Sequence, residues 1–267
     1  MKFKSIYLSI GLLCLSVLQL NGQAYGYSAF SSSISQGNAY FAALNNPSEL
    51  INAKTYLSYS ISNPYGIKDL HASGFSLQSS NKNFGAGISW QNEGNYAYQI
   101  NTIGISAALK PINDLSFGIK GYFERAKFSH YDKTKQSNID FSLSTQAHPK
   151  IKTSFIAKDI INHLKSKDNQ NIQNHAIIWS IGYTVEKRIK LLFEIEKSKL
   201  QHLHLKTAIA FQKDSIIKIN ICSSNGGKQL GLGIGLRKKK VELGFAFTAH
   251  IILGFSTCLS IAYEIKS

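Results

Sequence analysis

Residues that could do chemistry are few, and the first group to consider is a short run of histidines. His202, His204 and Lys206 alternate along one segment. If that segment is extended, alternate side chains project from one face, and a His-x-His pair of this kind can chelate a transition metal. No third ligand follows at a recognisable spacing. We therefore expect no metal site and no cofactor, and we interpret these residues as polar lining of a larger structure.

Nucleophilic catalysis finds equally little support. The chain has 8 histidines and many serines, so chance pairings of the two are unavoidable. No segment resembles a nucleophile elbow, in which a glycine-flanked serine is exposed on a sharp turn. We predict no catalytic residues, and we do not expect an enzyme.

The composition narrows the class of protein. Of 267 residues, 43% are hydrophobic and 17% are charged, with 30 Lys and Arg against 15 Asp and Glu. Only 4 Pro and 3 Cys are present, which excludes collagen and a disulfide-stapled miniprotein and argues against disorder. A cytosolic enzyme normally carries about 25% charged residues. The low fraction of charged residues and the 11% of aromatic residues are therefore not typical of a cytosolic enzyme.

The first 24 residues have the pattern of a secretory signal peptide. Lys2 and Lys4 precede an apolar run from Ile6 to Leu18, and Gly22 and Ala24 supply small residues before a cut after Ala24. The run is short for a membrane-spanning helix. We expect residues 1–24 to be removed on export, which makes a nucleic acid an improbable partner despite the formal charge of +15.

Beyond this leader the chain alternates with period two. In the run from Leu115 to Glu124, Phe117 and Ile119 share one face, while Ser116 and Lys120 share the other. Either a soluble sandwich or a membrane barrel could bury such strands. The polar faces are rich in Gly, Ser, Ala, Asn and Gln rather than in charges, which suits a crowded, wet barrel interior. We predict an all-β transmembrane barrel in the cell outer membrane.

Fourteen antiparallel strands can be counted between residues 53 and 267. All turns that would lie at one end are short, and the two longest connections, 129–137 and 161–175, both fall at the other end. That is the pattern of short periplasmic turns and longer outer loops. Near Asn101 the apolar residues change face between Ile100 and Ile103, and we expect a bulge there.

The interior of a barrel of this size is too wide to be closed by side chains. Fourteen strands at a tilt of 40° enclose a backbone diameter of roughly 28 Å, too wide for side chains alone. The barrel (53–267) is therefore either plugged or an open pore, and residues 25–52 are the segment that could fold into its mouth as a plug. Strand parity places His202, His204, Lys206, Lys120 and Glu194 toward the interior, or lumen. Cys222 and Cys258 also point inward, about three strand spacings apart, and should remain free thiols.

Both ends of the mature chain resemble a known family. Gly37-Asn38-Ala39-Tyr40-Phe41-Ala42, followed by Asn46-Pro47-Ser48-Glu49-Leu50, is similar to the N-terminal stretch and Asn-Pro turn of the long-chain fatty acid transporter superfamily. Ser48 and Glu49 stand where that family commonly has Ala-Gly. The closing run from Ala249 to Tyr263 resembles the last hairpin of its PorV/PorQ branch, the accessory barrels of type IX secretion in Bacteroidetes.

The resemblance implies a 14-stranded outer-membrane barrel with an N-terminal plug, whose motif residues would be Gly37, Asn38, Asn46, Pro47 and Leu50. Two functions are compatible with it: a PorV/PorQ-like accessory of protein secretion or surface attachment, or a passive transporter of hydrophobic small molecules. The closing hairpin favours the accessory, with secretion or attachment proteins as partners. Outer-membrane lipid and lipopolysaccharide are expected partners in either case, the latter through the polar loop around Lys165 to Asn171.

Overall fold

The computed structural model describes residues 41–52, 54–129, 131–160, 175–198, 203–213, 216–224 and 229–266. The predicted signal peptide, Gly37, Asn38 and His202 lie outside these ranges. Two short helical segments, α2 (Ala42–Asn45) and the 3₁₀ helix η3 (Pro47–Asn52), precede the sheet. The strands are β1 (Thr55–Asn63), β2 (His71–Ser80), β3 (Phe84–Gly94), β4 (Tyr98–Ile112), β5 (Leu115–Phe128), β6 (Tyr131–His148), β7 (Ile151–Lys158), β8 (Ala176–Glu186), β9 (Ile189–Ser198), β10 (His204–Lys213), β11 (Ile217–Ser224), β12 (Gln229–Lys238), β13 (Val241–His250) and β14 (Gly254–Lys266).

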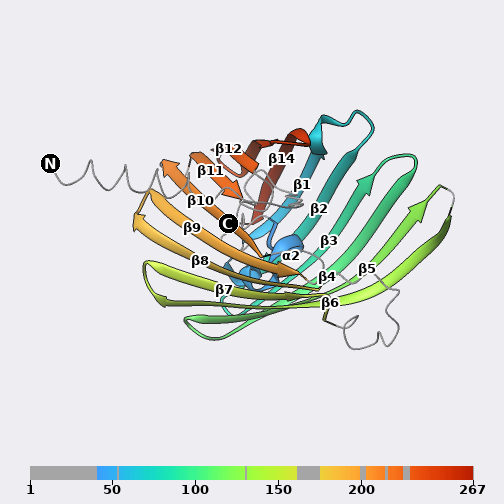
Figure 1. Ribbon diagram of the computed structural model, residues 1–267. Coiled ribbons are helices and arrows are strands. Elements are labelled where there is room, and N and C mark those ends of the chain that lie inside the picture. Colours follow the sequence, from blue (N-terminus) through green and yellow to red (C-terminus); the bar gives the residue numbers. More distant parts are fainter. Residues whose placement is uncertain are drawn as a thin grey trace.

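These fourteen strands form one closed antiparallel barrel (Figure 1). Each strand pairs with its neighbours in the sequence, and β1 closes the sheet against β14 in a register that runs from Thr55↔Lys266 to Asn63↔Thr257. The predicted fold and strand number are confirmed. A soluble sandwich is excluded, because a single closed sheet has no second sheet to cover its apolar face.

The two faces of this wall differ as the alternation predicts. Outward side chains include Phe117, Ile119 and Phe245, which are 36%, 49% and 45% exposed. Inward positions on the same strands carry small or polar residues, among them the buried Ser116 and Lys120. Large apolar side chains are therefore gathered on the outside, which is the arrangement required when hydrocarbon rather than water surrounds the barrel.

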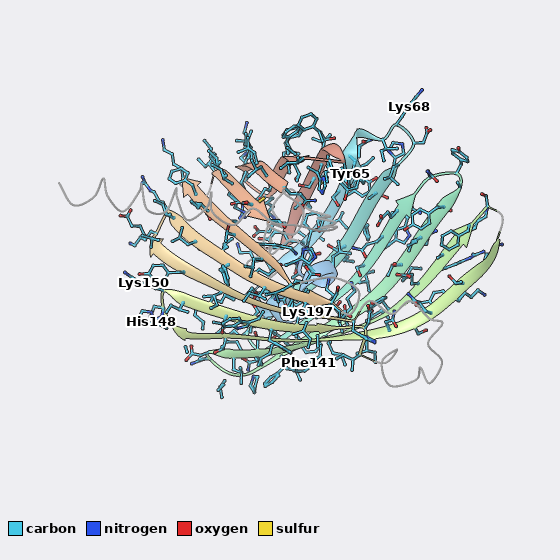
Figure 2. The ribbon with its side chains drawn as sticks, viewed as in Figure 1. Tyr65, Lys68, Phe141, His148, Lys150 and Lys197 are labelled. Atoms are coloured by element: carbon cyan, nitrogen blue, oxygen red, sulfur yellow. The ribbon has the colours of Figure 1, made fainter. Side chains whose placement is uncertain are left out.

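The two ends of the barrel are not alike. At one end, which we call the short-turn end, strands are joined by residues 81–83, 113–114, 149–150, 187–188, 214–216 and 239–240. At the opposite end, the long-connection end, β7 and β8 are joined by residues 159–175. Figure 2 places His148 and Lys150 at the first end and Tyr65 and Lys68 at the second. In outer-membrane barrels, the short turns are the ones that lie on the periplasmic side.

Two local expectations were wrong. Residues 131–137 of the predicted loop belong to β6, because β5 and β6 continue as a hairpin beyond the apolar part of the wall. No bulge occurs at Asn101, since β4 keeps a continuous register with β3 from Gln99 to Leu109. The pattern of apolar residues changes near Asn101 because the outward positions beyond Ile103 are polar. Ile100 is apolar but faces the interior of the barrel.

The helical segments are short. The 3₁₀ helix η4 (Pro64–Gly66) forms part of the connection between β1 and β2, and its Tyr65 has a left-handed φ of 58°. Among the described residues, no helix has the length and apolar character needed to cross a membrane.

A matched pair of substitutions on β4 tests the lipid contact. Ile105 is 68% exposed at mid-wall, whereas Gln99 is exposed on the same face beyond the apolar zone. We expect Ile105→Arg to lower the free energy of unfolding from phospholipid vesicles by about 2–4 kcal/mol, and Gln99→Arg to change it by at most about 1 kcal/mol. Equal small effects in guanidinium titrations would mean that this face meets water.

Candidate functional site

The segment formed by α2 and η3, residues Ala42–Asn52, lies within the ring of strands (Figure 1). The lumen supplies hydrogen bonds to its backbone. Ala43 N donates to Gln78 Oε1 at 3.2 Å, Ser106 Oγ donates to Ala43 O at 3.0 Å, and Lys120 Nζ donates to Leu44 O at 2.9 Å. A helix of four residues leaves most of its backbone groups without partners of its own, so side chains from β2, β4 and β5 satisfy them.

Small residues on the wall make room for this interior segment. A Cβ added to Gly87 would lie 2.7 Å from Ala43 Cβ, and one added to Gly118 would overlap the backbone nitrogen of Ser48. Both contacts are closer than real side-chain carbons allow. The Gly and Ser content of the inward face is therefore a packing requirement of the segment that lies against it.

Ser48 and Glu49 fix the segment to β6 and β7. Ser48 N donates to Ser142 Oγ at 2.8 Å, and the hydroxyls of Ser48 and Ser144 lie 2.6 Å apart. Ser144 also donates to Glu49 Oε1 at 3.0 Å, while Lys152 pairs with Glu49 Oε2. These two positions depart from the family pattern, and they supply the densest polar contacts between segment and wall.

The predicted motif residues that are described lie inside the barrel. Asn46 is 1% exposed and its Oδ1 accepts hydrogen bonds from the Ser48 backbone at 3.2 Å and hydroxyl at 2.7 Å. Pro47 is buried and packs beside Gly118, and Leu50 is fully buried against Gly85. Gly37 and Asn38 fall outside the described residues. Asn46 thus shapes the turn that presents Ser48 to β6.

Ion pairs line the wall farther along the chain. Lys206 Nζ lies 3.0 Å from Glu194 Oε1 and 2.7 Å from Glu196 Oε2, and Glu194 is fully buried. His204 is also buried, in register with Glu196, whereas His202 is not described. Within the described ranges, no group of three or more His, Cys, Asp or Glu is placed to hold a metal ion. Lys206 therefore forms ion pairs with both carboxylates and is not a metal ligand among the described residues.

The two cysteines within the described ranges lie on different strands. Cys222 is on β11 and Cys258 on β14, and both are free thiols, as the strand spacing predicts.

The pairing of β6 with β7 is interrupted among the described residues. Their pairing reaches Phe141↔Ala157 at the long-connection end, and β7 ends at Lys158. Residues 131–140 of β6 continue beyond that point, and among the described residues only β5 pairs with them. In Figure 1 the hairpin of β5 and β6 projects to one side while β7 to β10 run to the other. We call this interruption the β6–β7 opening.

A polar cluster lies at the inner side of this opening. Asp159 has a left-handed φ of 60°; its backbone N–H donates to Asp140 Oδ1 at 3.0 Å, and its carboxylate accepts a hydrogen bond from the Tyr122 hydroxyl. The His175 ring nitrogen lies 3.0 Å from the Asp159 carbonyl oxygen. Burial raises the pKa of the Asp159 carboxyl above its ordinary value of 3.8, and the Tyr122 hydrogen bond opposes this shift.

Sequence reasoning missed the anchoring residues. It recognised Ser48 and Glu49 only as departures from a family pattern, and it assigned no role to Gly87, Gly118 or Tyr122. The glycines carried a signal, because glycine at inward positions of a strand marks a close backbone approach. The pairing of Glu49 with Lys152 depends on residues 103 positions apart, so no local pattern could indicate it.

The comparison with solved structures supports the barrel fold. The chain matches no protein-family model, and no curated protein matches it. Among solved structures, it is similar to the toluene transporter TodX of Pseudomonas putida, with a TM-score of 0.66 and 8% identity over 93% of this chain and 100% of that one. It also resembles a Pseudomonas aeruginosa FadL homologue, with a TM-score of 0.59 and 9% identity over 92% and 100%, and the monoaromatic hydrocarbon channel CymD, with 0.61 and 9% over 91% and 98%. At these identities the likeness establishes the barrel architecture alone.

Two glycines on β5 test the packing of the interior segment. Gly118→Ala places a methyl group onto Ser48 and Pro47, whereas a Cβ on Gly121 meets nothing within 4 Å. We expect Gly118→Ala to lower the free energy of unfolding by about 1–3 kcal/mol, the usual cost of overpacking. Gly121→Ala should stay within about 0.5 kcal/mol of the original protein. Indistinguishable guanidinium unfolding curves for the two variants would show that the segment does not press on β5.

Asp159→Asn tests the cluster at the opening. The raised folded-state pKa means that the contribution of Asp159 to stability is complete below pH 3.8 and is lost as pH rises through the folded-state value. Asn tolerates a left-handed φ and still accepts the Tyr122 hydrogen bond without a charge. The variant should match the original at low pH and exceed its stability at neutral pH, measured by unfolding in detergent micelles. A variant that is less stable at neutral pH would show that the cluster depends on the carboxylate charge.

Proposed function

We propose that this protein is an outer-membrane channel for the passive passage of small hydrophobic molecules. The observation that carries the proposal is an interior segment packed against one side of the lumen, combined with a pairing of β6 and β7 that ends at Phe141↔Ala157 among the described residues. A barrel that served only as a structural element would need neither. The similarity of its fold to the solved structures of a toluene transporter and a monoaromatic hydrocarbon channel supports the same conclusion.

The interior segment acts in this proposal as the plug. Hydrogen bonds and the ion pair of Glu49 with Lys152 hold it, and its buried apolar side chains form two small clusters, in one of which Phe41 and Leu44 meet Tyr56 of β1. Hydrogen bonds to lumen serines exchange readily for water, so Ser48 can leave β6 without exposing apolar surface of its own. A shift of residues 47–50 would widen the lumen beside β5 and β6.

The β6–β7 opening provides the second part of the path. A hydrophobic molecule that enters the lumen gains by leaving toward hydrocarbon rather than toward water. The opening lies directly above Phe141, which is 37% exposed on the outer face, so it adjoins the apolar surface of the barrel. A molecule that left the lumen at this point would not have to pass the ion pairs that Lys206 makes with Glu194 and Glu196.

The alternative of a secretion or attachment accessory has less support. Apart from residues 159–175, the described connections at the long-connection end are short, such as 95–97 and 251–253. That leaves little surface for docking a large protein. Recovery of secreted or surface-attached proteins with the purified barrel, together with unchanged uptake in a deletion strain, would favour the accessory role.

A reversible cross-link tests the channel directly. Because the hydroxyls of Ser48 and Ser144 lie 2.6 Å apart, the double variant Ser48→Cys/Ser144→Cys can join the plug to β6 by a disulfide. In cells that depend on this barrel, we expect the oxidised variant to take up toluene and oleate at the rate of cells without the barrel, and a reductant to restore uptake. The single variant Ser48→Cys is the matched control and should be insensitive to redox conditions. Equal uptake by oxidised and reduced forms would contradict a moving plug, and uptake unaffected by loss of the barrel would contradict the channel.

A further inference from the structure

The outer wall of β3 to β6 changes character abruptly toward the long-connection end. One row of outward residues across these strands is Trp90, Ile103 and Phe123, which are in register and exposed. The next outward row lies two residues farther along each strand, a distance of about 7 Å along the strand. It consists of Asn92, Asn101, Arg125 and Lys135. The change from aromatic and aliphatic to polar and cationic side chains marks the level at which lipid tails give way to headgroups.

Four cations gather on the outward face at and above this level. Arg125 lies directly opposite Lys135 in the pairing of β5 with β6, and Lys127 is in register with Gln99 of β4. Lys133 is two residues from Lys135, beside the shift in register between Ala126↔Thr134 and Phe128↔Tyr131. All four side chains are exposed. We call Arg125, Lys127, Lys133 and Lys135 the cationic cluster.

The described side chains of the cluster are all cationic. No salt bridge joins any of its four members to a carboxylate in the described part of the chain. The nearby Glu124 is bound by Gln136 Nε2 at 2.6 Å. Like charges directly opposite each other in an antiparallel pair are destabilising. The placement of Arg125 against Lys135 becomes favourable when a multivalent anion lies between them.

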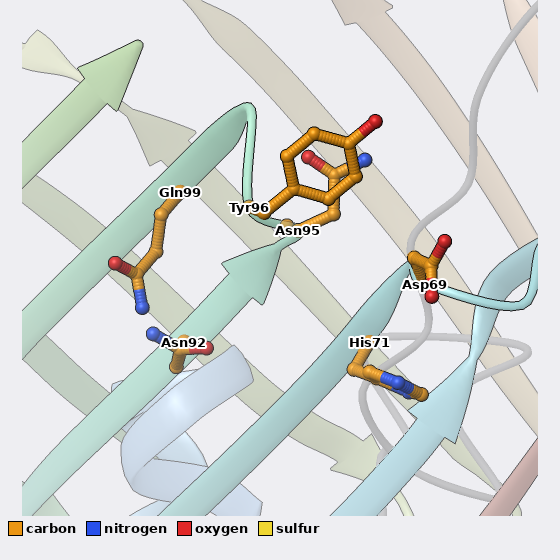
Figure 3. Close-up of a pocket in the computed structure, with 7 residues that line it drawn as sticks. Asp69, His71, Asn92, Asn95, Tyr96 and Gln99 are labelled. Atoms are coloured by element: carbon orange, nitrogen blue, oxygen red, sulfur yellow. The ribbon is translucent and has the colours of Figure 1, made fainter. Parts of the chain in front are cut away.

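A polar pocket adjoins the cluster on the same outer face. It has a volume of about 330 Å³ and is lined by Asp69, His71, Asn92, Tyr96 and Gln99, among others (Figure 3). Tyr96 is 88% exposed at the turn between β3 and β4. Carboxylate and amide oxygens accept hydrogen bonds and amide nitrogens donate them, which matches hydroxyl groups that do both. The pocket therefore suits a sugar, with Tyr96 offering an aromatic face.

We propose that the cationic cluster and this pocket together bind the phosphorylated saccharide headgroup of a lipopolysaccharide-type glycolipid in the outer leaflet. The phosphates lie against the cluster, where Arg and Lys form charge-assisted hydrogen bonds. The sugar hydroxyls lie in the pocket, and the acyl chains lie against the row of Trp90, Ile103 and Phe123. This inference rests on the outer-membrane location in the proposed function, but it does not depend on transport.

Lipid binding by the purified, folded, full-length barrel in detergent tests the proposal. The probes are bisphosphorylated lipid A, dephosphorylated lipid A and phosphatidylglycerol, with dissociation constants measured by native mass spectrometry. We expect the bisphosphorylated form to bind at least about tenfold more tightly than either of the others, because it alone carries two phosphates on a saccharide. Equal binding of dephosphorylated lipid A or of phosphatidylglycerol would overturn the proposal.

A matched pair of charge-removal variants locates the site. The variant Arg125→Gln/Lys127→Gln/Lys133→Gln/Lys135→Gln should weaken lipid A binding about tenfold or more. The control Lys187→Gln/Arg188→Gln/Lys239→Gln/Lys240→Gln removes the same charges from exposed positions at the short-turn end and should change binding by less than about twofold. Equal losses in both variants would show a non-specific effect of net charge and overturn the proposal.

Unfolding curves and uptake measurements on the same variants distinguish a loss of lipid A binding from a loss of folding or transport. Loss of like-charge repulsion should leave the β5–β6 hairpin at least as stable, so unfolding curves of the cluster variant should not shift to lower denaturant. If they do, the smaller variant Lys133→Gln/Lys135→Gln replaces it, with a loss of several-fold expected and an unchanged affinity overturning the proposal. Lipid A binding that persists in a barrel without uptake of toluene or oleate would refute the proposed function alone.

Discussion

Backbone hydrogen bonding is the constraint on which the rest of this structure depends. A strand exposed to hydrocarbon cannot leave its N–H and C=O groups unpaired, so the sheet must close on itself. Closure is achieved between β1 and β14, and charged groups reinforce the seam at the short-turn end. Glu264 of β14 accepts from Lys54 Nζ at 2.7 Å and pairs with Arg237 of β12. The one carboxylate thus links the residue just before β1 to two strands at the far end of the chain.

Closure with fourteen strands creates the second requirement, which is to occupy the interior. The chain meets it unevenly. Strands β2 to β6 present Gly and Ser inward, so the backbone of residues 42–52 can approach within direct hydrogen-bonding distance of the wall. Farther along the chain, inward positions carry the larger Lys206 and Glu194, which neutralise each other. Within the described ranges, one side of the lumen is therefore shaped by a segment of backbone and the other by side chains.

The fold was predictable because its main determinant is local. Alternation of Phe117 and Ile119 with Ser116 and Lys120 places each residue inside or outside without knowledge of its neighbours. The errors arose where the surroundings change along a strand. Above Ile103 the outward face meets headgroups and water, so Asn101 and Arg125 are favourable there and the alternation no longer separates inside from outside. The contact of Glu49 with Lys152 and the approach of Ser48 to Gly118 depend on tertiary packing, which a single sequence does not reveal.

Unequal strand lengths determine where the wall opens. β6 has 18 residues and its neighbour β7 has 8, so the edge of β6 outlasts its partner on that side. A long apolar extension would be insoluble above the membrane, and this one carries Lys133 and Lys135 instead. At β13 and β14 the opposite holds: Ile251 and Ile252, at the turn, are 68% and 77% exposed, so apolar residues reach the tip of that hairpin. The unequal strand lengths thereby produce the β6–β7 opening, and the polar residues that allow β5 and β6 to stand in water produce the charged surface beside it.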